Sequence, residues 1–167
     1  MEFTIRAEES TDIEQVREIV GTAFPTEAES KLVDALRANG KAIISLVAVS
    51  GDEVLGHILF SGVSTTPPDP AKGIGLAPVA VRPDVQALGI GSRLIHEGLR
   101  LCKEFHFDCC VVLGDPKYYQ RFGFQKASKF GMRNEYGVDH EFMVIHFTDR
   151  NVAGMVKYAS EFARFSV

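Results

Sequence analysis

Apolar residues in the N-terminal part of the chain recur at intervals of three and four, which is the spacing of one buried helix face. Residues 3–7 come first and predict a short strand. The capping box Thr11-Asp-Ile-Glu14 then predicts the start of a helix. The inward side chains expected for that helix are Ile13, Val16, Val20, Ala23 and Phe24. A second helix should begin at residues 26–29, bury Leu32, Val33 and Leu36, and end at Asn39-Gly40.

Two β-branched apolar runs follow, at residues 43–49 and 54–63, and the Ser50-Gly51-Asp52 turn between them predicts a hairpin. Residues 65–70 are rich in proline and threonine and predict a surface loop. A third strand is expected at residues 74–81, with Pro78 inside it. Because proline has no N–H to donate, we expect this strand to be bulged or to lose its pairing there.

The second half of the chain predicts a long helix between two parallel strands. The apolar spacing indicates a helix of about four turns. The residues expected on its inward face are Ile90, Leu94, Ile95, Leu99, Cys102 and Phe105. The strand after it is residues 109–113, which completes a right-handed βαβ unit with the strand at 74–81. Further expected elements are a helical turn at 117–122, a strand near 124–130, a last strand at 141–147, and an amphipathic tail helix bearing Val152, Met155, Val156 and Ala159.

Gly89 and Gly91 lie where the third strand should turn into the long helix. The first turn of a helix has N–H groups without partners, and the helix dipole adds about half a positive charge there. Glycine also lets a ligand approach the backbone closely. The turn therefore predicts an anion site suited to a phosphate or pyrophosphate. The alternative is that both glycines serve only a tight connection.

Two other phosphate motifs fit these residues less well. A P-loop needs a Lys followed by Ser or Thr after its last glycine, where this chain has Ser92-Arg93. A dinucleotide fingerprint needs a third small residue, where this chain has Leu94. Asp115 does end the following strand, as a ribose-binding acid would, so a nicotinamide-dependent oxidoreductase stays open as an alternative.

Val79-Ala-Val-Arg-Pro83 followed by Gln86-Ala-Leu-Gly89-Ile-Gly91 resembles the signature of the GNAT superfamily of acetyltransferases. Gly114-Asp-Pro-Lys-Tyr-Tyr119 and Arg121-Phe-Gly-Phe124 resemble a branch of small bacterial predicted acetyltransferases, in which a Tyr lies four residues before a Gly-Phe pair. The resemblance covers nearly the whole chain. It implies an α/β (α+β) fold over residues 1–167 as a single domain. The expected core is a mixed, mostly antiparallel sheet with a splayed strand pair and flanking helices.

The resemblance implies an enzyme that moves an acetyl group from acetyl-CoA to an amine by direct attack in a ternary complex. The pyrophosphate would be held by the backbone N–H groups of Gln86, Ala87, Leu88, Gly89, Ile90, Gly91 and Ser92. Val79 and Val81 would pair with the pantetheine arm, and an N–H near Val79 or Ala80 would polarise the thioester carbonyl. A module that binds acetyl-CoA without catalysis is the main alternative.

Tyr119 matches the tyrosine of that branch and is the expected general acid, since a phenol is protonated at neutral pH. A packing role, or an acid role for Tyr118, is the alternative. No base stands out. Glu27 and Glu29 lie on the segment that borders the acceptor site in the family, and His57 lies within a strand, but a solvated helix turn and a core histidine explain them equally well. A chain of water molecules could carry the proton instead.

Composition and charge argue against several classes of partner and ligand. The net charge is −4 and Lys and Arg are dispersed, which argues against nucleic acid. The start shows no secretion signal and no apolar run approaches the roughly 20 residues of a membrane helix, so we expect a cytoplasmic location. Cys102, Cys109, Cys110 and five scattered histidines have no metal-site spacing, so no metal is expected. The acceptor can be a small-molecule amine, a lysine or a protein N-terminus, and a homodimer stays open.

Overall fold

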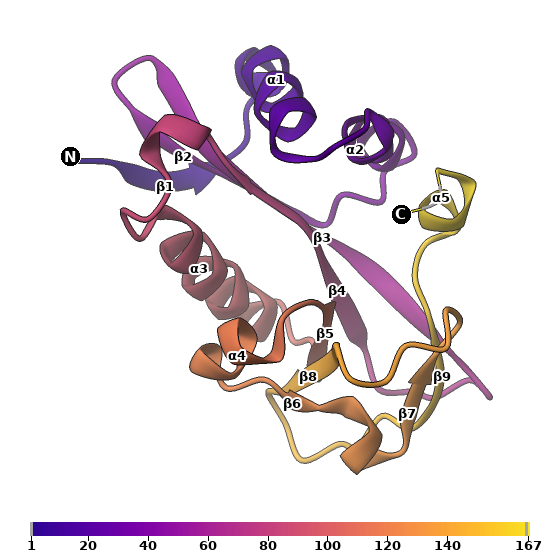
Figure 1. The fold of residues 1–167 in the computed structure, drawn as a ribbon. Coiled ribbons are helices and arrows are strands. Elements are labelled where there is room, and N and C mark those ends of the chain that lie inside the picture. Colours follow the sequence, from indigo (N-terminus) through magenta and orange to yellow (C-terminus); the bar gives the residue numbers. More distant parts are fainter. Residues whose placement is uncertain (1, 166) are drawn as a thin grey trace. The chain divides into compact units, whose positions relative to one another are not determined.

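The computed structural model describes residues 2–165 and Val167 (Figure 1). The chain forms two structural units, each discontinuous in sequence. The first comprises residues 1–61, 77–98 and 160–167, and the second comprises residues 62–76 and 99–159. Strand β3 (Glu53–Thr66), strand β4 (Gly73–Val81) and helix α3 (Ile90–Glu104) each contribute to both units. In the part of the chain that is described, no helix is long and apolar enough to cross a membrane.

The first unit is built on an antiparallel sheet of β1 (Thr4–Ala7), β2 (Ile44–Ser50) and the start of β3. Helix α1 (Ile13–Ala23) and helix α2 (Ala28–Ala38) lie on one side of this sheet, and the start of α3 lies on the other (Figure 1). Gly51 makes the β2–β3 turn with a φ of 59°. The predicted strand, two helices and hairpin are therefore confirmed.

Helix α1 begins differently from the prediction. A 3-10 turn, η1 (Ser10–Asp12), leads into it, and the Asp12 carboxylate accepts the Glu9 N–H at 2.7 Å. The expected box at Thr11 and Glu14 is thus wrong by two residues. The reason is Arg6, whose guanidinium makes two hydrogen bonds to Asp12, of 2.7 and 3.0 Å, and so holds that carboxylate inside the protein.

Alternate residues of β3 face α3. A Cβ added at Gly56 would lie 3.1 Å from Ile90 Cγ2 and from Leu94 Cδ1, and one added at Gly98 would lie 2.3 Å from Phe60 Cε1. Missing side chains at these glycines let the helix settle closely on the sheet. The C-terminal helix α5 (Ser160–Arg164) is fixed to the end of α2 through Glu161, which accepts from Lys41 Nζ at 2.8 Å and Asn39 Nδ2 at 2.6 Å.

The second unit contains the parallel pair that the sequence predicts. Strand β5 (Cys109–Leu113) pairs with β4 from Gly73 to Gly75, and β8 (Phe142–His146) lies antiparallel on the other edge of β5. The β4–β5 ladder ends at Gly75, so Pro78 lies three residues past it and the expected lapse in pairing is confirmed.

The remaining elements of this unit are short. They are α4 (Pro116–Tyr119), the 3-10 turns η3 (Gln120–Phe122) and η4 (Ala127–Phe130), and the strands β6 (Gln125–Lys126), β7 (Met132–Asn134) and β9 (Gly154–Lys157). β6 pairs with β8, whereas β9 lies between β7 and the end of β3. The helical turn expected at 117–122 is confirmed, with its end at Gly123.

Three expectations for this half were wrong. The strand expected near 124–130 is only β6, because the 3-10 turn η4 follows it at once. The tail helix expected to carry Val152, Met155, Val156 and Ala159 is instead strand β9 followed by α5, since residues 155–157 pair with the end of β3. Phe105 is 48% exposed rather than inward, because His106, with a φ of 66°, ends the helix there.

The two helical glycines Gly98 and Gly21 give a stability test. Gly98→Ala places a methyl group against the buried Phe60 ring, whereas Gly21→Ala meets nothing within 4 Å. We expect Gly98→Ala to lower the free energy of unfolding by about 1–3 kcal/mol through overpacking. Gly21→Ala should raise it by up to about 1 kcal/mol through helix propensity. Urea unfolding of both variants checks this, and equal effects at the two positions would contradict the packing.

Candidate functional site

The turn between β4 and α3 presents a row of backbone N–H groups. In the described part of the chain, none of the N–H groups from Gln86 to Ser92 donates to a protein acceptor, and the next one, of Arg93, donates to Gly89 O at 3.1 Å. Ala87 and Gly89 are both left-handed, with φ of 67° and 83°. Left-handed residues in such a turn direct successive N–H groups to one side, which makes an anion-binding concavity. We call residues 86–92 the cradle.

The cradle is held at its start by hydrogen bonds and at its end by a buried side chain. The Gln86 side chain donates to Val81 O at 3.2 Å, and the Arg82 N–H donates to Leu55 O at 2.8 Å. The Arg82 guanidinium is held by Asp84 at 2.6 and 3.0 Å. Residues 86–89 themselves are exposed, whereas Ile90 is buried and anchors the first turn of α3. The cradle is therefore rigidly attached but open to a ligand.

The predicted residues Val79, Ala80 and Val81 form the last part of β4. Ala80 is buried, and its two neighbours are partly exposed. Because the β4–β5 ladder stops at Gly75, this stretch has a strand edge outside that ladder. Such an edge can pair with an extended ligand by main-chain hydrogen bonds.

Tyr119 closes helix α4 in the second unit. Asp115 caps that helix by accepting the Lys117 N–H at 3.0 Å. The Tyr119 ring packs edge-on against Phe124, with centroids 5.6 Å apart, and over Gly114, where an added Cβ would lie 2.3 Å from Tyr119 Cε2. Gly114 is thus needed for the position of the ring, a role that no local sequence signal predicts.

The Tyr119 hydroxyl is available for chemistry. Within the described residues nothing hydrogen-bonds it, and it is not among the enclosed polar atoms without a partner, so it reaches the surface while the ring stays buried. Burial, with smaller effects of Tyr118 and Cys110, raises the pKa of Tyr119 well above its usual range. The phenol is therefore protonated at neutral pH and can act as a donor.

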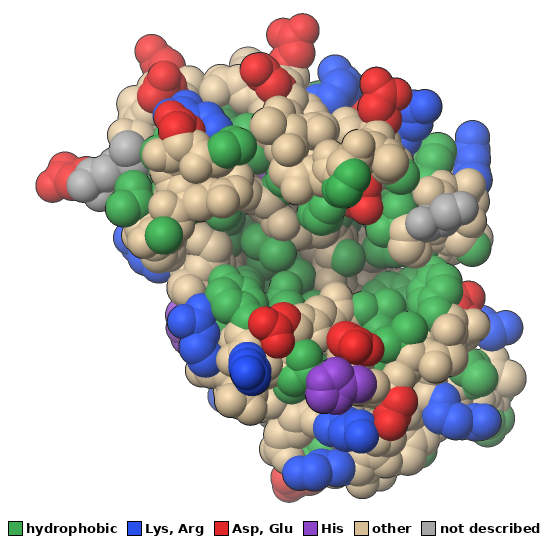
Figure 2. Space-filling view, in the orientation of Figure 1, with side chains coloured by type: hydrophobic (Ala, Val, Ile, Leu, Met, Phe, Trp, Pro, Cys, Tyr) green, Lys and Arg blue, Asp and Glu red, His purple; other side chains and the backbone are tan. Residues whose placement is uncertain are grey.

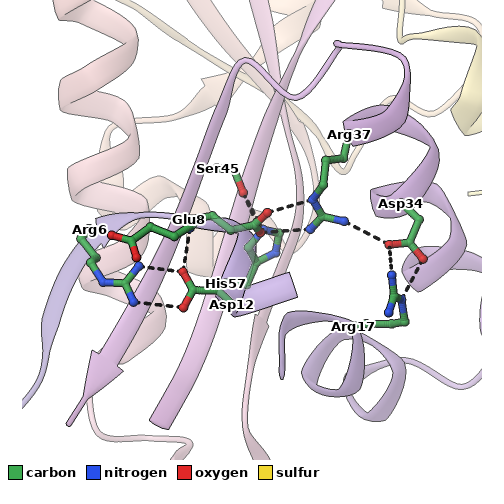
Figure 3. Close-up of polar contacts among 9 residues, drawn as sticks. Arg6, Glu8, Asp12, Arg17, Asp34, Arg37, Ser45 and His57 are labelled. Atoms are coloured by element: carbon green, nitrogen blue, oxygen red, sulfur yellow. Dashed lines mark hydrogen bonds and ion pairs between the residues drawn. The ribbon is translucent and has the colours of Figure 1, made fainter. Parts of the chain in front are cut away.

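His57 lies on β3 inside a polar network that joins five segments of the first unit (Figure 3). Its Nε2 is 2.9 Å from Ser45 Oγ and 3.2 Å from Glu8 Oε2. Glu8 also accepts two hydrogen bonds from Arg37, of 2.8 and 3.0 Å. Arg37 and Arg17 in turn both bind Asp34, which joins the network to α1.

The charges of this network can be assigned. Burial raises the pKa of Glu8, but the hydrogen bonds from His57 and Arg37 outweigh it, so that the pKa falls to about 2. Burial lowers the pKa of His57 despite the neighbouring carboxylate. A neutral imidazole that donates its Nε2–H to an ionised Glu8 satisfies both directions. The other two base candidates differ: Glu27 is exposed and pairs with Lys31 at 3.6 Å, whereas Glu29 has one buried oxygen without a partner.

The three cysteines are free and buried. Burial raises the pKa of Cys109 to about 12, so this thiol stays protonated. Among the residues described, no group of His, Cys, Asp or Glu side chains could hold a metal ion. On the face drawn in Figure 2, Lys and Arg are interspersed with Asp and Glu rather than gathered into one stripe.

Comparison with known proteins decides the family. The sequence model of the acetyltransferase (GNAT) family matches residues 13–124. The chain belongs to this family. It is also 34% identical over 166 residues to the Escherichia coli K12 protein named Uncharacterized N-acetyltransferase YhbS, covering 96% of this chain and 99% of that one.

Two solved structures support the GNAT fold. The E. coli YhbS structure, in complex with CoA, has a TM-score of 0.91 and 33% identity and covers 98% of this chain and 93% of that one. A GNAT family acetyltransferase from Brucella melitensis, in complex with acetyl-CoA, has a TM-score of 0.82 and 35% identity and covers 96% of this chain and 98% of that one. The predicted family, the acetyltransferase class and the mixed, mostly antiparallel fold are therefore confirmed. The roles of single residues stay predictions.

Proposed function

We propose that this GNAT acetyltransferase takes the acetyl group from acetyl-CoA, whose pyrophosphate is held by the cradle, and passes it to an amine. The observation that carries the proposal is the row of seven N–H groups, from Gln86 to Ser92, that donate to no acceptor within the described residues. Several N–H groups that face one side at the start of a helix suit a ligand with several acceptor oxygens, such as a pyrophosphate. The CoA and acetyl-CoA complexes of the two relatives support the same choice.

Acetyl-CoA supplies an acetyl group already activated as a thioester. The protein has to hold its carbonyl, bring the amine to it, and supply a proton to the departing sulfur. The N–H of Val79 or Ala80 is the donor proposed for the carbonyl oxygen, because a fixed donor stabilises the negative charge that develops there. Val79 and Val81 pair with the pantetheine arm along the free strand edge.

Tyr119 is the proposed acid for the departing sulfur. The motif match and the protonated, accessible phenol support this role. The amine acceptor is a small molecule, a lysine or a protein N-terminus. We further infer a cytoplasmic enzyme, which three free cysteines favour, and leave open a homodimer.

Replacing Gly91 tests the cradle. Acetyl-CoA at a hundredfold excess over its dissociation constant should stabilise the wild type by about 2.7 kcal/mol. For a chain of this size the melting temperature should rise by roughly 5–10 °C, whereas NAD should leave it unchanged. Gly91→Glu puts a carboxylate at the proposed pyrophosphate site, so the acetyl-CoA shift should disappear.

The matched control for that experiment is Gly21→Glu, which makes the same substitution at an open position of α1. It should keep the full acetyl-CoA shift. A rise in melting temperature with NAD and none with acetyl-CoA would contradict the proposed function. An undiminished acetyl-CoA shift in Gly91→Glu would show that the cradle only connects β4 to α3.

Tyr119→Phe tests the acid. The change keeps the ring and removes the donor, so kcat should fall by about 10²–10⁴-fold or somewhat less. The acetyl-CoA affinity should change by less than about tenfold, because the phenol serves the chemical step. Thiol release would be followed with ethanolamine, putrescine, a lysine peptide and a peptide with a free N-terminus, with mass spectrometry of the products.

Tyr118→Phe is the matched control and should be nearly silent. Gly114→Ala should lower kcat in the wild type by displacing the Tyr119 ring, but should add little to Tyr119→Phe, since the same donor is already lost. Unchanged turnover in Tyr119→Phe would return Tyr119 to a packing role.

A further inference from the structure

The loop after β7, in the second unit, is held as a fixed turn by a buried side chain. Asn134 is 3% exposed, and its Oδ1 accepts the N–H groups of Tyr136 and Val138 at 3.0 and 3.2 Å. Its Nδ2 donates to Val138 O at 2.6 Å. Gly137 turns the chain with a φ of 70°. Glu135 and Tyr136 are therefore exposed at fixed positions on this loop.

The Glu135 carboxylate carries a negative charge that no cation of the described residues neutralises. Its Oε1 accepts the N–H of Tyr158, the residue after β9, at 3.0 Å. No Lys, Arg or His side chain of the described residues forms an ion pair with it. An exposed acid is usually a mobile, solvated group, whereas this one is attached to the neighbouring backbone.

Two tyrosine rings lie beside this carboxylate. The Tyr136 and Tyr158 ring centroids are 6.3 Å apart, at an interplanar angle of 37°. Burial raises the pKa of Tyr136, and the charge of Glu135 raises it further, which places the carboxylate close to the phenol. The face of a phenol ring attracts a cation, so one ammonium group can contact the ring and the carboxylate together. We call Glu135, Tyr136 and Tyr158 the tyrosine–carboxylate site.

The tyrosine–carboxylate site adjoins the point where the β4–β5 pairing ends. The Tyr158 ring covers Gly75, where an added Cβ would lie 2.7 Å from Tyr158 Cε1. Gly75 is the last residue of the β4–β5 ladder and pairs with Val111. Gly114, which lies under the Tyr119 ring, follows Val111 by three residues, or about 10 Å along the strand. The site and the proposed acid thus lie at the same end of β5.

Tyr158 is close to both groups. Burial is the main cause that raises its pKa, and the charges that raise it further include those of Glu135 and Tyr119. Such an influence requires proximity, because Coulomb interactions weaken with distance. A ligand that reacts beside Tyr119 can therefore extend over Tyr158 toward Glu135.

We propose that the tyrosine–carboxylate site binds a second ammonium group of the acceptor, so that the acceptor is a diamine or polyamine. This inference rests on the proposed function, because it takes Tyr119 to mark the position of the reacting sulfur. One nitrogen is acetylated there while the other stays charged, against the Glu135 carboxylate and the face of the Tyr136 ring.

The bound ammonium takes no part in the chemistry and keeps its proton. At the other nitrogen the N–C bond forms and the C–S bond of acetyl-CoA breaks. The sulfur leaves as a thiol, and one proton is released to solvent for each ammonium group converted to an amide. A monoamine can undergo the same reaction, but it leaves the Glu135 charge without a counter-ion. The site therefore sets which amine is preferred rather than how the acetyl group moves.

Glu135→Gln tests the proposal, since glutamine keeps an oxygen for the Tyr158 N–H and loses only the charge. The value of kcat/KM is measured for n-butylamine and for putrescine or spermidine, whichever turns over faster. The ratio of the diamine or polyamine value to the butylamine value should fall about 3–10-fold relative to the wild type, through a higher KM. The value for butylamine and the melting shift with acetyl-CoA should be unchanged.

Three control variants separate the ring, the charge and the net charge of the protein. Tyr136→Leu removes the ring and should raise the KM of the same diamine or polyamine about 2–5-fold. Tyr136→Phe keeps the ring and should leave that KM within about twofold of the wild type. Glu104→Gln makes the same substitution as Glu135→Gln at an exposed position of α3, and should leave the ratio unchanged.

An unchanged ratio in Glu135→Gln, or an equal fall in Glu104→Gln, would overturn the role of the tyrosine–carboxylate site. A wild type that acetylates either peptide of the panel but neither putrescine nor spermidine would also overturn it, and would leave the proposed function standing. A wild type that binds acetyl-CoA and acetylates no amine at all would overturn the proposed function itself.

Discussion

A helix cannot satisfy its own first N–H groups, and here the whole candidate site depends on that constraint. Among the residues that the structure describes, no side chain hydrogen-bonds to these groups before α3. Ala87 and Gly89 instead take left-handed conformations, and seven consecutive N–H groups are left for a ligand among the residues described. A left-handed alanine costs about 1–2 kcal/mol. Hydrogen bonds of Gln86 and Arg82 hold the start of the turn, and the buried Ile90 holds its end.

The packing of β3 against α3 supports the cradle. Gly56 and Gly98 let α3 lie close against β3, and this contact fixes the helix whose first turn ends the cradle. The opposite face of β3 carries His57, whose surroundings are polar although it is completely buried. The Arg37–Glu8 pair makes that burial tolerable, because each charge is matched by hydrogen bonds of 2.8–3.0 Å. One face of β3 thus packs against α3, and the other carries a buried polar network.

Sequence reasoning located the elements that carry strong local signals. The glycine turn, the long helix and the lapse at Pro78 followed from turn chemistry and from the missing proline donor. Elements whose secondary structure is set by tertiary contacts could not be predicted from the sequence. Val152, Met155 and Val156 have helical spacing, yet Val156 lies in a strand because the end of β3 offers an edge to pair with. The left-handed Ala87 and the contact between Gly114 and Tyr119 carry no local signal at all, since neither residue type demands its environment.

The central claim is that backbone N–H groups, rather than side-chain charges, hold the phosphates. Amide NMR spectra recorded while CoA is added test it most directly. The account predicts that the largest changes in amide shift fall within residues 86–92, and that acetyl-pantetheine, which lacks the pyrophosphate, leaves these amides almost unchanged. Large changes elsewhere with an unaltered cradle, or equal changes with acetyl-pantetheine, would contradict it.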